Sequence, residues 1–304
     1  MIINNDYRFI GSDLRKIRES KGISRKEISE KMYISEETIR RIEKGENDPR
    51  LSTLVPLCNY LDIDLKDIIS GKEFEYKNLL SLRNEIHYLI NNYSIEKATR
   101  LIKNLDELSF DSHIYYEKEL FATRHYFNGV ISVIKNGNRK DSLNDFEIAL
   151  SEMNSKFKIN KFKDYKYDNF SLRILLAIAL NEYRIGNFEL YKDIILVIKD
   201  YLDLSLDNYF LFAYNVAAYY SRVGNYLESL RICNEAANNA KIIKEAYYLN
   251  MLYYIKGVNH VYLEQLKEAS LSFNYCLALT NIFSEKSLAN SISKQINTLM
   301  ANHK

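Results

Sequence analysis

Proline is nearly absent from this sequence, and its few positions lie in one region. Both prolines, Pro49 and Pro56, lie in the first fifth of the 304-residue chain, and none follows. Because proline interrupts helices by removing a backbone donor, its absence permits long helices after residue 56. Apolar residues in that stretch recur at helical spacing, and the alternation typical of strands is rare. We therefore expect an all-α fold.

Cysteine, glycine and histidine are scarce and form no chemical motif. The three cysteines, Cys58, Cys233 and Cys276, are odd in number and far apart, which argues against a disulfide framework and favours a reducing compartment. The nine glycines form no phosphate-binding loop, and the five histidines lack the spacing of metal ligands. We therefore expect neither an enzyme nor a bound cofactor or metal.

Long apolar runs and an excess of charge are also missing. The most apolar run, ILLAIAL at residues 174–180, is too short to span a bilayer and is followed by Asn181 and Glu182. The first residues lack a basic start followed by an apolar core, so we expect no signal peptide. The net charge of +2 gives no global signal for nucleic acid, so such a site must be local. These features predict a cytoplasmic protein without a membrane partner.

Helix signals follow one another closely in the first 70 residues. Ser24 and Glu27 have the spacing of a capping box, Ser35 is an N-cap candidate, and Gly45 is suited to end the helix that Ser35 begins. The five expected helices cover about residues 11–20, a segment after Ser24, and residues 35–45, 51–61 and 65–70. Their expected core consists of Leu14, Ile17, Ile28, Met32, Ile39, Ile42, Leu54 and Leu57. We expect residues 1–70 to form a separate N-terminal domain.

The rest of the sequence repeats a helical hairpin. Gly186-Asn187-Phe188 and Gly224-Asn225-Tyr226 occupy the same point of two hairpins, 38 residues apart. This period is typical of tetratricopeptide-type solenoids, and Gly257, Ala269 and Phe273 hold the small and aromatic places of a later unit. We expect the small residues to let the two antiparallel helices of a hairpin approach closely, and the aromatic residue to fill the gap to the next hairpin. The expected elements are five hairpins at residues 74–108, 112–155, 168–203, 208–243 and 247–282, a basic and aromatic insert at 156–168, and a capping helix at 285–302.

Residues 22–49, GISRKEISEKMYISEETIRRIEKGENDP, resemble the helix-turn-helix of the Cro/repressor-like (XRE) family. The matching features are the Gly-Ile-Ser entry, the Ser35 cap, the apolar pair Ile39 and Ile42, the RIEKG exit and the proline that follows. The resemblance covers roughly residues 11–69 and implies that the helix after Ser35 enters the DNA major groove. The resemblance implies base contacts for Glu36, Glu37 and Arg41, base or phosphate contacts for Arg40 and Lys44, and a phosphate contact for Arg25. Ser35, the cap of the helix, completes the implied DNA-contacting set. A helix-turn-helix used only for dimerisation or docking is the alternative.

Two glutamates open the expected recognition helix, although carboxylates repel phosphate groups. Glu36 and Glu37 are suited to accept a hydrogen bond from the amino group of cytosine, and they also favour the positive end of the helix dipole. So close to the DNA backbone, they lower the non-specific affinity that phosphate contacts supply. Lysines and arginines of the same region offset them, namely Arg15, Lys16, Arg18, Lys21, Arg25, Lys26, Lys31, Arg40, Arg41 and Lys44.

An XRE-type head at residues 1–70 before a tetratricopeptide-like body at residues 71–304 resembles the peptide-pheromone regulators of the Rgg/PlcR/PrgX (RRNPP) group, most closely the PlcR-like and ComR-like members. The resemblance implies a cytoplasmic, homodimeric transcription regulator of quorum sensing. Its implied partners are double-stranded DNA with an inverted-repeat operator and a short signalling peptide in the concave groove of the repeats. The alternative is a helix-turn-helix repressor or adaptor whose repeats bind a protein partner.

A row of amides supports a peptide groove. Alignment of the hairpins by their glycine and small-residue positions places Asn84, Asn128 and Asn215 at the same point on the first helix of their units. An amide side chain both donates to and accepts from a peptide group, and arginine can clamp a carboxylate. The candidate peptide-binding residues are Asn84, Arg124, Asn128, Arg173, Asn181, Arg184, Tyr214, Asn215, Arg222, Asn250 and Tyr254. The same residue types are also common at solvated helix positions, so both interpretations stay open.

Overall fold

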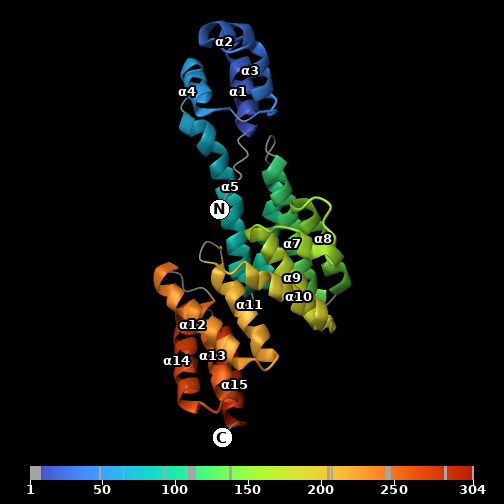
Figure 1. Cartoon of the computed structure of the whole chain (residues 1–304), viewed down its shortest axis with the longest axis vertical. Helices are drawn as coiled ribbons and strands as arrows, with labels where there is room; N and C mark the ends of the chain where they lie inside the picture. Colours follow the sequence, from blue (N-terminus) through green and yellow to red (C-terminus); the bar gives the residue numbers. More distant parts are fainter. Residues whose placement is uncertain are drawn as a thin grey trace. The chain divides into compact units, whose positions relative to one another are not determined.

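The computed structural model describes residues 8–47, 49–63, 65–91, 94–108, 114–136, 139–203, 206, 208–243, 248–283 and 286–302 (Figure 1). Within these residues the regular structure is entirely helical, which confirms the expected all-α class. The chain divides into two compact units. Residues 1–87 and 98–124 form the first unit, and residues 88–97 and 125–304 form the second.

Four short helices build the head of the first unit. They are α1 (Arg8–Ser20), α2 (Arg25–Met32), α3 (Glu36–Glu43) and α4 (Leu51–Tyr60). Helix α3 packs against α1 and α2, and α2 also contacts α4. Their shared core consists of Ile10, Leu14, Ile28, Ile39, Ile42, Leu54, Leu57, Cys58, Leu61 and Ile68, with Met32 at its edge. Ile17, which we expected in this core, is only partly buried and lies outside the cluster.

A glycine fixes the close crossing of α1 and α3. A Cβ atom on Gly11 would lie 1.7 Å from the carbonyl oxygen of Ile42. Any side chain at this position would therefore force the two helix backbones apart. The recognition helix candidate α3 is thus seated directly on the backbone of α1.

The fifth helix differs from our expectation. Helix α5 runs without interruption from Leu65 to Asn91, whereas we predicted one helix ending near residue 70 and another beginning near residue 74. That prediction was wrong because one helix continues through Gly71. A glycine inside a helix costs only about 1 kcal/mol relative to alanine, and no proline is present to stop the helix. The division into domains at residues 70 and 71 stays a prediction, and it falls inside this helix.

Helix pairs follow one another to the end of the chain, close to the ranges that we predicted. They are α5 with α6 (Ile95–Asn104), α7 (Ile114–Asn136) with α8 (Arg139–Met153), α9 (Asn169–Ile185) with α10 (Phe188–Asp200), α11 (Tyr209–Arg222) with α12 (Tyr226–Ile243), and α13 (Leu249–Tyr262) with α14 (Leu266–Phe283). From α8 onward each helix packs on the next, and α11 also packs on α13. This nearest-neighbour pattern is that of a solenoid.

The last helix, α15 (Lys286–Ala301), covers the end of the second unit. It packs on α14, and Ile292 and Ile296 join Val261 and Phe273 in one buried cluster. An end repeat needs such a cover because its apolar face has no following neighbour. The predicted capping helix is therefore confirmed.

The small and aromatic positions of the repeats face each other within one hairpin, whereas we expected the aromatic residue to fill the gap to the next hairpin. A Cβ atom on Gly257 would lie 2.4 Å from the ring of Phe273, and one on Gly129 would lie 2.6 Å from the ring of Phe146. In both hairpins an aromatic ring of the second helix therefore lies flush against a glycine of the first. The repeat spacing seen in the sequence thus reflects a packing contact.

The insert between the second and third hairpins is folded. It contains the short 3₁₀ helix η2 (Ile159–Asp164), comparable to η1 (Leu105–Glu107) at the end of α6. Its aromatic side chains Phe157, Phe162 and Tyr167 are buried. The lysines of the insert are exposed to solvent. Its aromatic residues therefore pack in the interior, while its positive charge lies on the surface.

Candidate functional site

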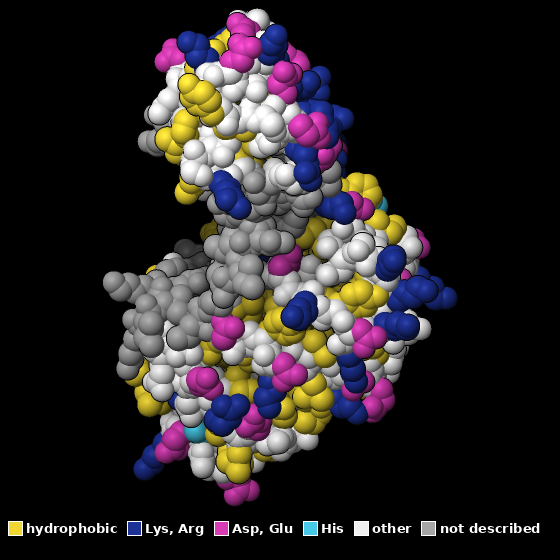
Figure 2. All heavy atoms as spheres, turned by 45° about the horizontal axis from the view of Figure 1, so that its top comes forward, with side chains coloured by type: hydrophobic (Ala, Val, Ile, Leu, Met, Phe, Trp, Pro, Cys, Tyr) yellow, Lys and Arg dark blue, Asp and Glu magenta, His cyan; other side chains and the backbone are white. Residues whose placement is uncertain are grey.

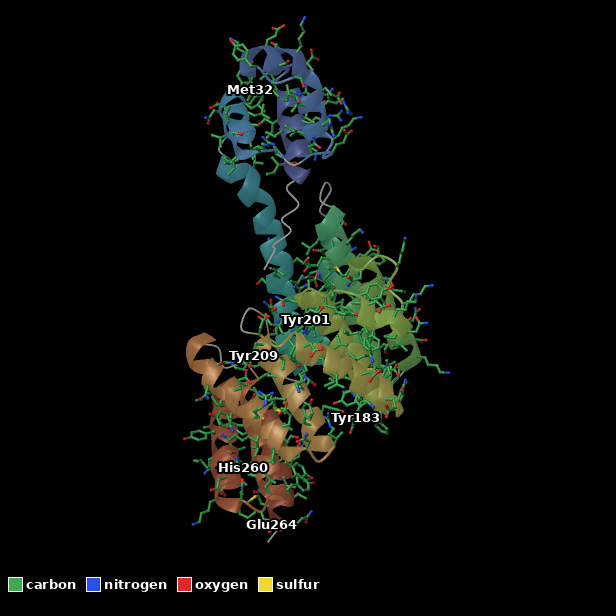
Figure 3. All side chains as sticks on the ribbon, in the orientation of Figure 1. Met32, Tyr183, Tyr201, Tyr209, His260 and Glu264 are labelled. Carbon is green, nitrogen blue, oxygen red and sulfur yellow. The ribbon has the colours of Figure 1, made fainter. Side chains whose placement is uncertain are left out.

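Two capped helices form the candidate DNA-reading motif. Ser24 Oγ accepts from the Glu27 amide at 3.1 Å, while the Glu27 carboxylate accepts from the Ser24 amide at 2.7 Å, which confirms the predicted capping box. These bonds hold the pKa of Glu27 below its ordinary value. Met32, labelled in Figure 3, ends α2, and Tyr33 then turns the chain with a φ of 55°. Tyr33 is left 96% exposed at the tip of the turn.

Helix α3 begins and ends where we expected. Ser35 Oγ accepts from the Thr38 amide at 3.1 Å, and Gly45 adopts a φ of 66° just after the helix. Ile39 and Ile42 point into the head core. The charged side chains of α3 and its C-cap that reach solvent are Glu36, Glu37, Arg40, Arg41 and Lys44, and Thr38 is exposed beside them. The candidate reading surface therefore carries two carboxylates and three cations.

A buried ion-pair cluster fixes α3 to the two helices before it. Arg18 donates from Nε to Glu43 at 2.6 Å and from Nη2 at 3.1 Å, and Arg25 Nε donates to the same carboxylate at 2.7 Å. The side chains of Arg18 and Glu43 are only 8% and 3% exposed, and the bonds to Glu43 raise the pKa of Arg18. Arg25, which we expected to contact phosphate, is therefore held by Glu43. Sequence reasoning missed Glu43, because its partners lie far from it along the chain.

A second ion-pair network lies on the exposed side of the motif. Arg40 donates two hydrogen bonds to Glu37, at 2.6 and 2.7 Å, and two to Glu46, at 3.0 and 3.1 Å. The bonds from Arg40 hold the pKa of Glu37 below its ordinary value. Arg41 lies 3.6 Å from Glu46 and donates to Asn47 at 3.3 Å. Figure 2 shows the result as basic and acidic side chains next to one another on the head.

The three asparagines of the predicted row have different surroundings. Asn84 and Asn128 are exposed. Asn215 is 5% exposed, and its amide donates to the carbonyl oxygen of Leu211 in its own helix at 2.8 Å. Arg124 donates to the carbonyl oxygens of Leu105 and Leu108, so it ties α7 to the segment after α6.

Helix α9 carries three of the predicted peptide-binding residues. Arg173 is 9% exposed, and its buried Nε has no hydrogen-bond partner among the described residues. Asn181 donates to the carbonyl oxygen of Arg139 at 3.0 Å. Burial and the charge of Arg139 lower the pKa of Arg184. An arginine buried without a carboxylate partner is expensive to desolvate, so Arg173 is suited to meet an anionic group.

Arg222 joins two neighbouring hairpins through aromatic side chains. Its Nη1 donates to the hydroxyl of Tyr191 at 2.7 Å, and its guanidinium lies 4.8 Å from the ring centre of Tyr183. Tyr183 is labelled near the end of α9 in Figure 3. Burial raises the pKa of Tyr214, which lies on the same helix as Arg222.

The two predicted residues of α13 contact the helices that follow it. Asn250 donates to Thr280 Oγ1 at 3.0 Å, and the Tyr254 hydroxyl donates to Gln295 Oε1 at 3.2 Å. Both side chains therefore have a protein partner and are only partly buried. They would have to exchange these partners to contact a ligand.

One open depression in the second unit lies apart from the predicted residues. It has a volume of about 560 Å³ and is lined by Lys199, Tyr220, Asn225, Leu227, Glu228 and Arg231. Lys199 donates to the Tyr220 hydroxyl at 2.9 Å and to Glu228 at 3.0 Å. Hydrogen bonds from Arg231 and Lys199 lower the pKa of Glu228 to about 2. The charged side chains that line the depression are thus paired with one another.

Two kinds of feature are absent from the part of the chain that the structure describes. No helix there is both long and apolar enough to cross a membrane. Nor do the described residues contain a group of three or more histidine, cysteine, aspartate or glutamate side chains placed to hold a metal ion.

Comparison with known proteins agrees with the description of the head and with that of the helical repeats. Residues 14–68 match the family model described as helix-turn-helix. The HTH-type transcriptional regulator ImmR of Bacillus subtilis is 26% identical over 110 residues, which cover 36% of this chain and 80% of ImmR. The head is therefore a helix-turn-helix domain, as its motif predicted.

The whole chain resembles two solved structures. Bacillus thuringiensis PlcR, in complex with the peptide PapR7 and DNA, matches 94% of this chain and 98% of its own with a TM-score of 0.57 and 19% identity. The apo form of ComR from S. thermophilus matches 95% of this chain and 98% of its own with a TM-score of 0.52 and 16% identity. The predicted fold, an XRE-type head with a helical solenoid of the PlcR and ComR kind, is therefore confirmed.

Proposed function

We propose that this chain, which carries a helix-turn-helix at residues 14–68 and has the fold of PlcR and ComR, is a transcription regulator that binds DNA through α3. The observation that carries the proposal is the Ser35-capped helix with five charged side chains facing solvent. The Arg18–Glu43–Arg25 cluster supports it by holding α3 rigidly in the head. A rigid helix with a polar outer face suits readout of the major groove.

The repeat domain is proposed to bind a short signalling peptide that controls DNA binding. PlcR shares the fold of this chain and was solved with the peptide PapR7 and DNA. Two residues of the second unit support a peptide as the ligand, because they offer donors for its carbonyl and carboxylate groups: Asn128, whose amide is exposed, and Arg173, whose buried Nε has no hydrogen-bond partner among the described residues. The other candidates with a present partner would exchange it on binding.

A homodimer acting on an inverted-repeat operator in the cytoplasm completes the proposal. Exposed side chains of α14 support association, since Leu271, Tyr275 and Ile282 recur at helical spacing with Ala278 between them. Exposed apolar stripes commonly mark interaction surfaces. The same stripe favours the alternative function, a helix-turn-helix repressor or adaptor whose repeats bind a different protein.

A gel-shift assay with the protein's own upstream DNA tests the DNA half of the proposal. We expect a specific shift that excess unrelated DNA does not remove. Peptides encoded by small neighbouring reading frames are then added, and one of them should change the shift at fixed protein concentration. Absence of any specific shift, with or without peptide, would reject a DNA-binding role.

A pull-down separates the two functions of the repeats. If the repeats serve a protein partner, a stable complex should form with that protein, and no peptide should alter DNA binding. If they serve a peptide, titration calorimetry should detect direct binding of the same peptide that changes the shift.

A further inference from the structure

Arg40 is engaged more completely than any other side chain on the exposed face of α3. Its Nε and Nη2 donate to Glu37, and its Nη1 and Nη2 donate to Glu46. These bonds use all but one of the N–H donors of the guanidinium. Isolated surface ion pairs hold geometry poorly, but bidentate pairs joined in a network fix both partners. Arg40 is therefore poorly placed to grip a phosphate group.

Glu37 is the partner whose position matters for DNA. It is the second residue of α3, in the turn that meets base edges when such a helix enters the major groove. Its side chain is 63% exposed, so the carboxylate is accessible. Arg40 lies on one side of the two oxygens, and their remaining lone pairs are free to accept further hydrogen bonds. An acceptor fixed in this way is suited to the exocyclic amino group of cytosine.

Glu46 completes the arrangement from outside the helix. It lies after the Gly45 turn and contacts Arg40 from the other side, with its side chain 40% exposed. With both carboxylates in place, the network of Glu37, Arg40 and Glu46 carries a net negative charge. Among the described residues, the neighbouring Arg41 makes only a 3.3 Å hydrogen bond and a 3.6 Å ion pair, so it keeps more donors for DNA.

We propose that Arg40 is a positioning residue and not a phosphate contact: held by Glu46, it fixes the Glu37 carboxylate as an acceptor for the amino group of a cytosine. The inference rests on the proposed function, since it requires α3 to enter the major groove. It gives Arg40 a different role from Arg41 and Lys44, although the family resemblance implies that all three contact DNA. Base choice at one position then depends on an arginine that does not touch the DNA.

Selection from a randomised duplex library by the full-length chain tests the readout. The wild-type protein should enrich cytosine at one position of its site, by roughly 5- to 100-fold over other bases. Glu37→Gln should change the preferred base at that position alone. Arg40→Ala and Arg40→Lys should both lose the preference, because lysine keeps the charge but cannot form the fork. Arg41→Ala is the control, and it should alter a different position.

Salt dependence on one fixed duplex of random sequence tests the absence of a phosphate contact. The salt slope, meaning the absolute slope of log K against log salt, falls by about 0.9 when one phosphate contact is lost. Arg40→Ala should leave this slope unchanged. Glu46→Gln should raise it, because Arg40 regains donors that can reach the backbone. Glu30→Gln makes the same charge change on α2, where the side chain is 66% exposed, and should leave the slope as it is.

The outcomes separate this inference from the proposed function. A wild-type chain that selects no sequence would overturn both. A chain that selects a site whose preferences survive Arg40→Lys, or a slope that falls by about 0.9 in Arg40→Ala, would overturn the role of Arg40 alone. Circular dichroism of each variant checks that the helices are kept. Arg40→Lys preserves the test should Arg40→Ala fail to fold.

Discussion

Arg40 and Arg41 are adjacent in sequence but differ in what they are able to reach. Arg41 has the weaker contacts of the two and its side chain is 48% exposed, so it is the better candidate for a base edge. We expect Arg41→Ala to cost about 1–3 kcal/mol in binding to the preferred site and to broaden base choice at one position. Footprinting on the selected site would check this, and an unchanged footprint would contradict the assignment.

Glu43 holds two arginines with one carboxylate, and both bonds depend on its charge. Glu43→Gln would remove the buried counter-charge of Arg18 and leave it only Glu19, a half-exposed carboxylate 3.2 Å away. Removal of one partner from a buried pair typically costs about 3 kcal/mol or more. We expect faster hydrogen exchange of the amides of α1 and α3 as the head opens more often. Glu30→Gln, an exposed carboxylate on α2, serves as control and should change exchange little.

Glu228 makes the packing of the α10–α12 region sensitive to acid. Its pKa falls from an ordinary value of 4.5 to about 2, because Arg231 and Lys199 donate hydrogen bonds to its charged form. A depressed folded pKa means that this stabilisation is complete above pH 4.5 and is lost as the pH falls toward 2. Glu228→Gln should therefore flatten the pH dependence of stability in that interval. Thermal unfolding followed at several pH values would detect the change, and parallel curves for variant and wild type would contradict it.

At the scale of helices, the glycine and aromatic pairs of the hairpins are the contacts that set the spacing. Gly257→Ala would place a methyl group 2.4 Å from the Phe273 ring, so the ring or the helix must shift. Overpacking of this kind costs about 1–3 kcal/mol, which outweighs the gain of about 1 kcal/mol in helix propensity. We expect a lower unfolding temperature. Adding Phe273→Leu should restore part of the lost unfolding temperature. A Gly257→Ala variant that unfolds at a higher temperature than the wild type would show that the Phe273 ring moves aside at little cost.

The elements were predictable wherever a local signal marks them. Ser24, Ser35 and Gly45 cap their helices as expected, since a cap depends on residues three or four positions away. The continuous α5 was missed because one glycine weakens a helix without ending it. Long-range partners gave no signal, so the sequence could not place Glu43 beside Arg18.

For the candidate peptide-binding residues, too, the sequence did not predict which partners their side chains contact. Helical phase places Asn215 on a face of α11, but its burial depends on the neighbouring helices. Its amide bonds to the Leu211 carbonyl of its own helix. The fold class and the repeat period follow from patterns that recur along the chain. The individual contacts of Arg124 and Arg222, and the burial of Arg173, follow from packing between helices, which a periodicity does not encode.

For the whole molecule, the proposed homodimer is the feature with the largest consequence. An operator with two half-sites binds two heads at once, so joining them raises the effective concentration of the second head. Each head, whose recognition surface carries paired charges, then needs only a modest affinity for its half-site. The exposed stripe on α14 is the surface proposed for this association.

Charged substitutions on this stripe test the dimer. Leu271→Glu together with Ile282→Glu would bring like charges together in a self-associating interface, so the sedimenting mass should fall from that of a dimer to that of a monomer. Affinity for an inverted repeat should fall steeply, while affinity for a single half-site should stay the same. Asn274→Glu together with Asn281→Glu adds the same charge to other exposed positions of α14 and should leave both quantities unchanged. A mass that stays dimeric in the first variant would place the association elsewhere on the chain, and equal losses of affinity in both variants would show a general effect of charge on DNA binding.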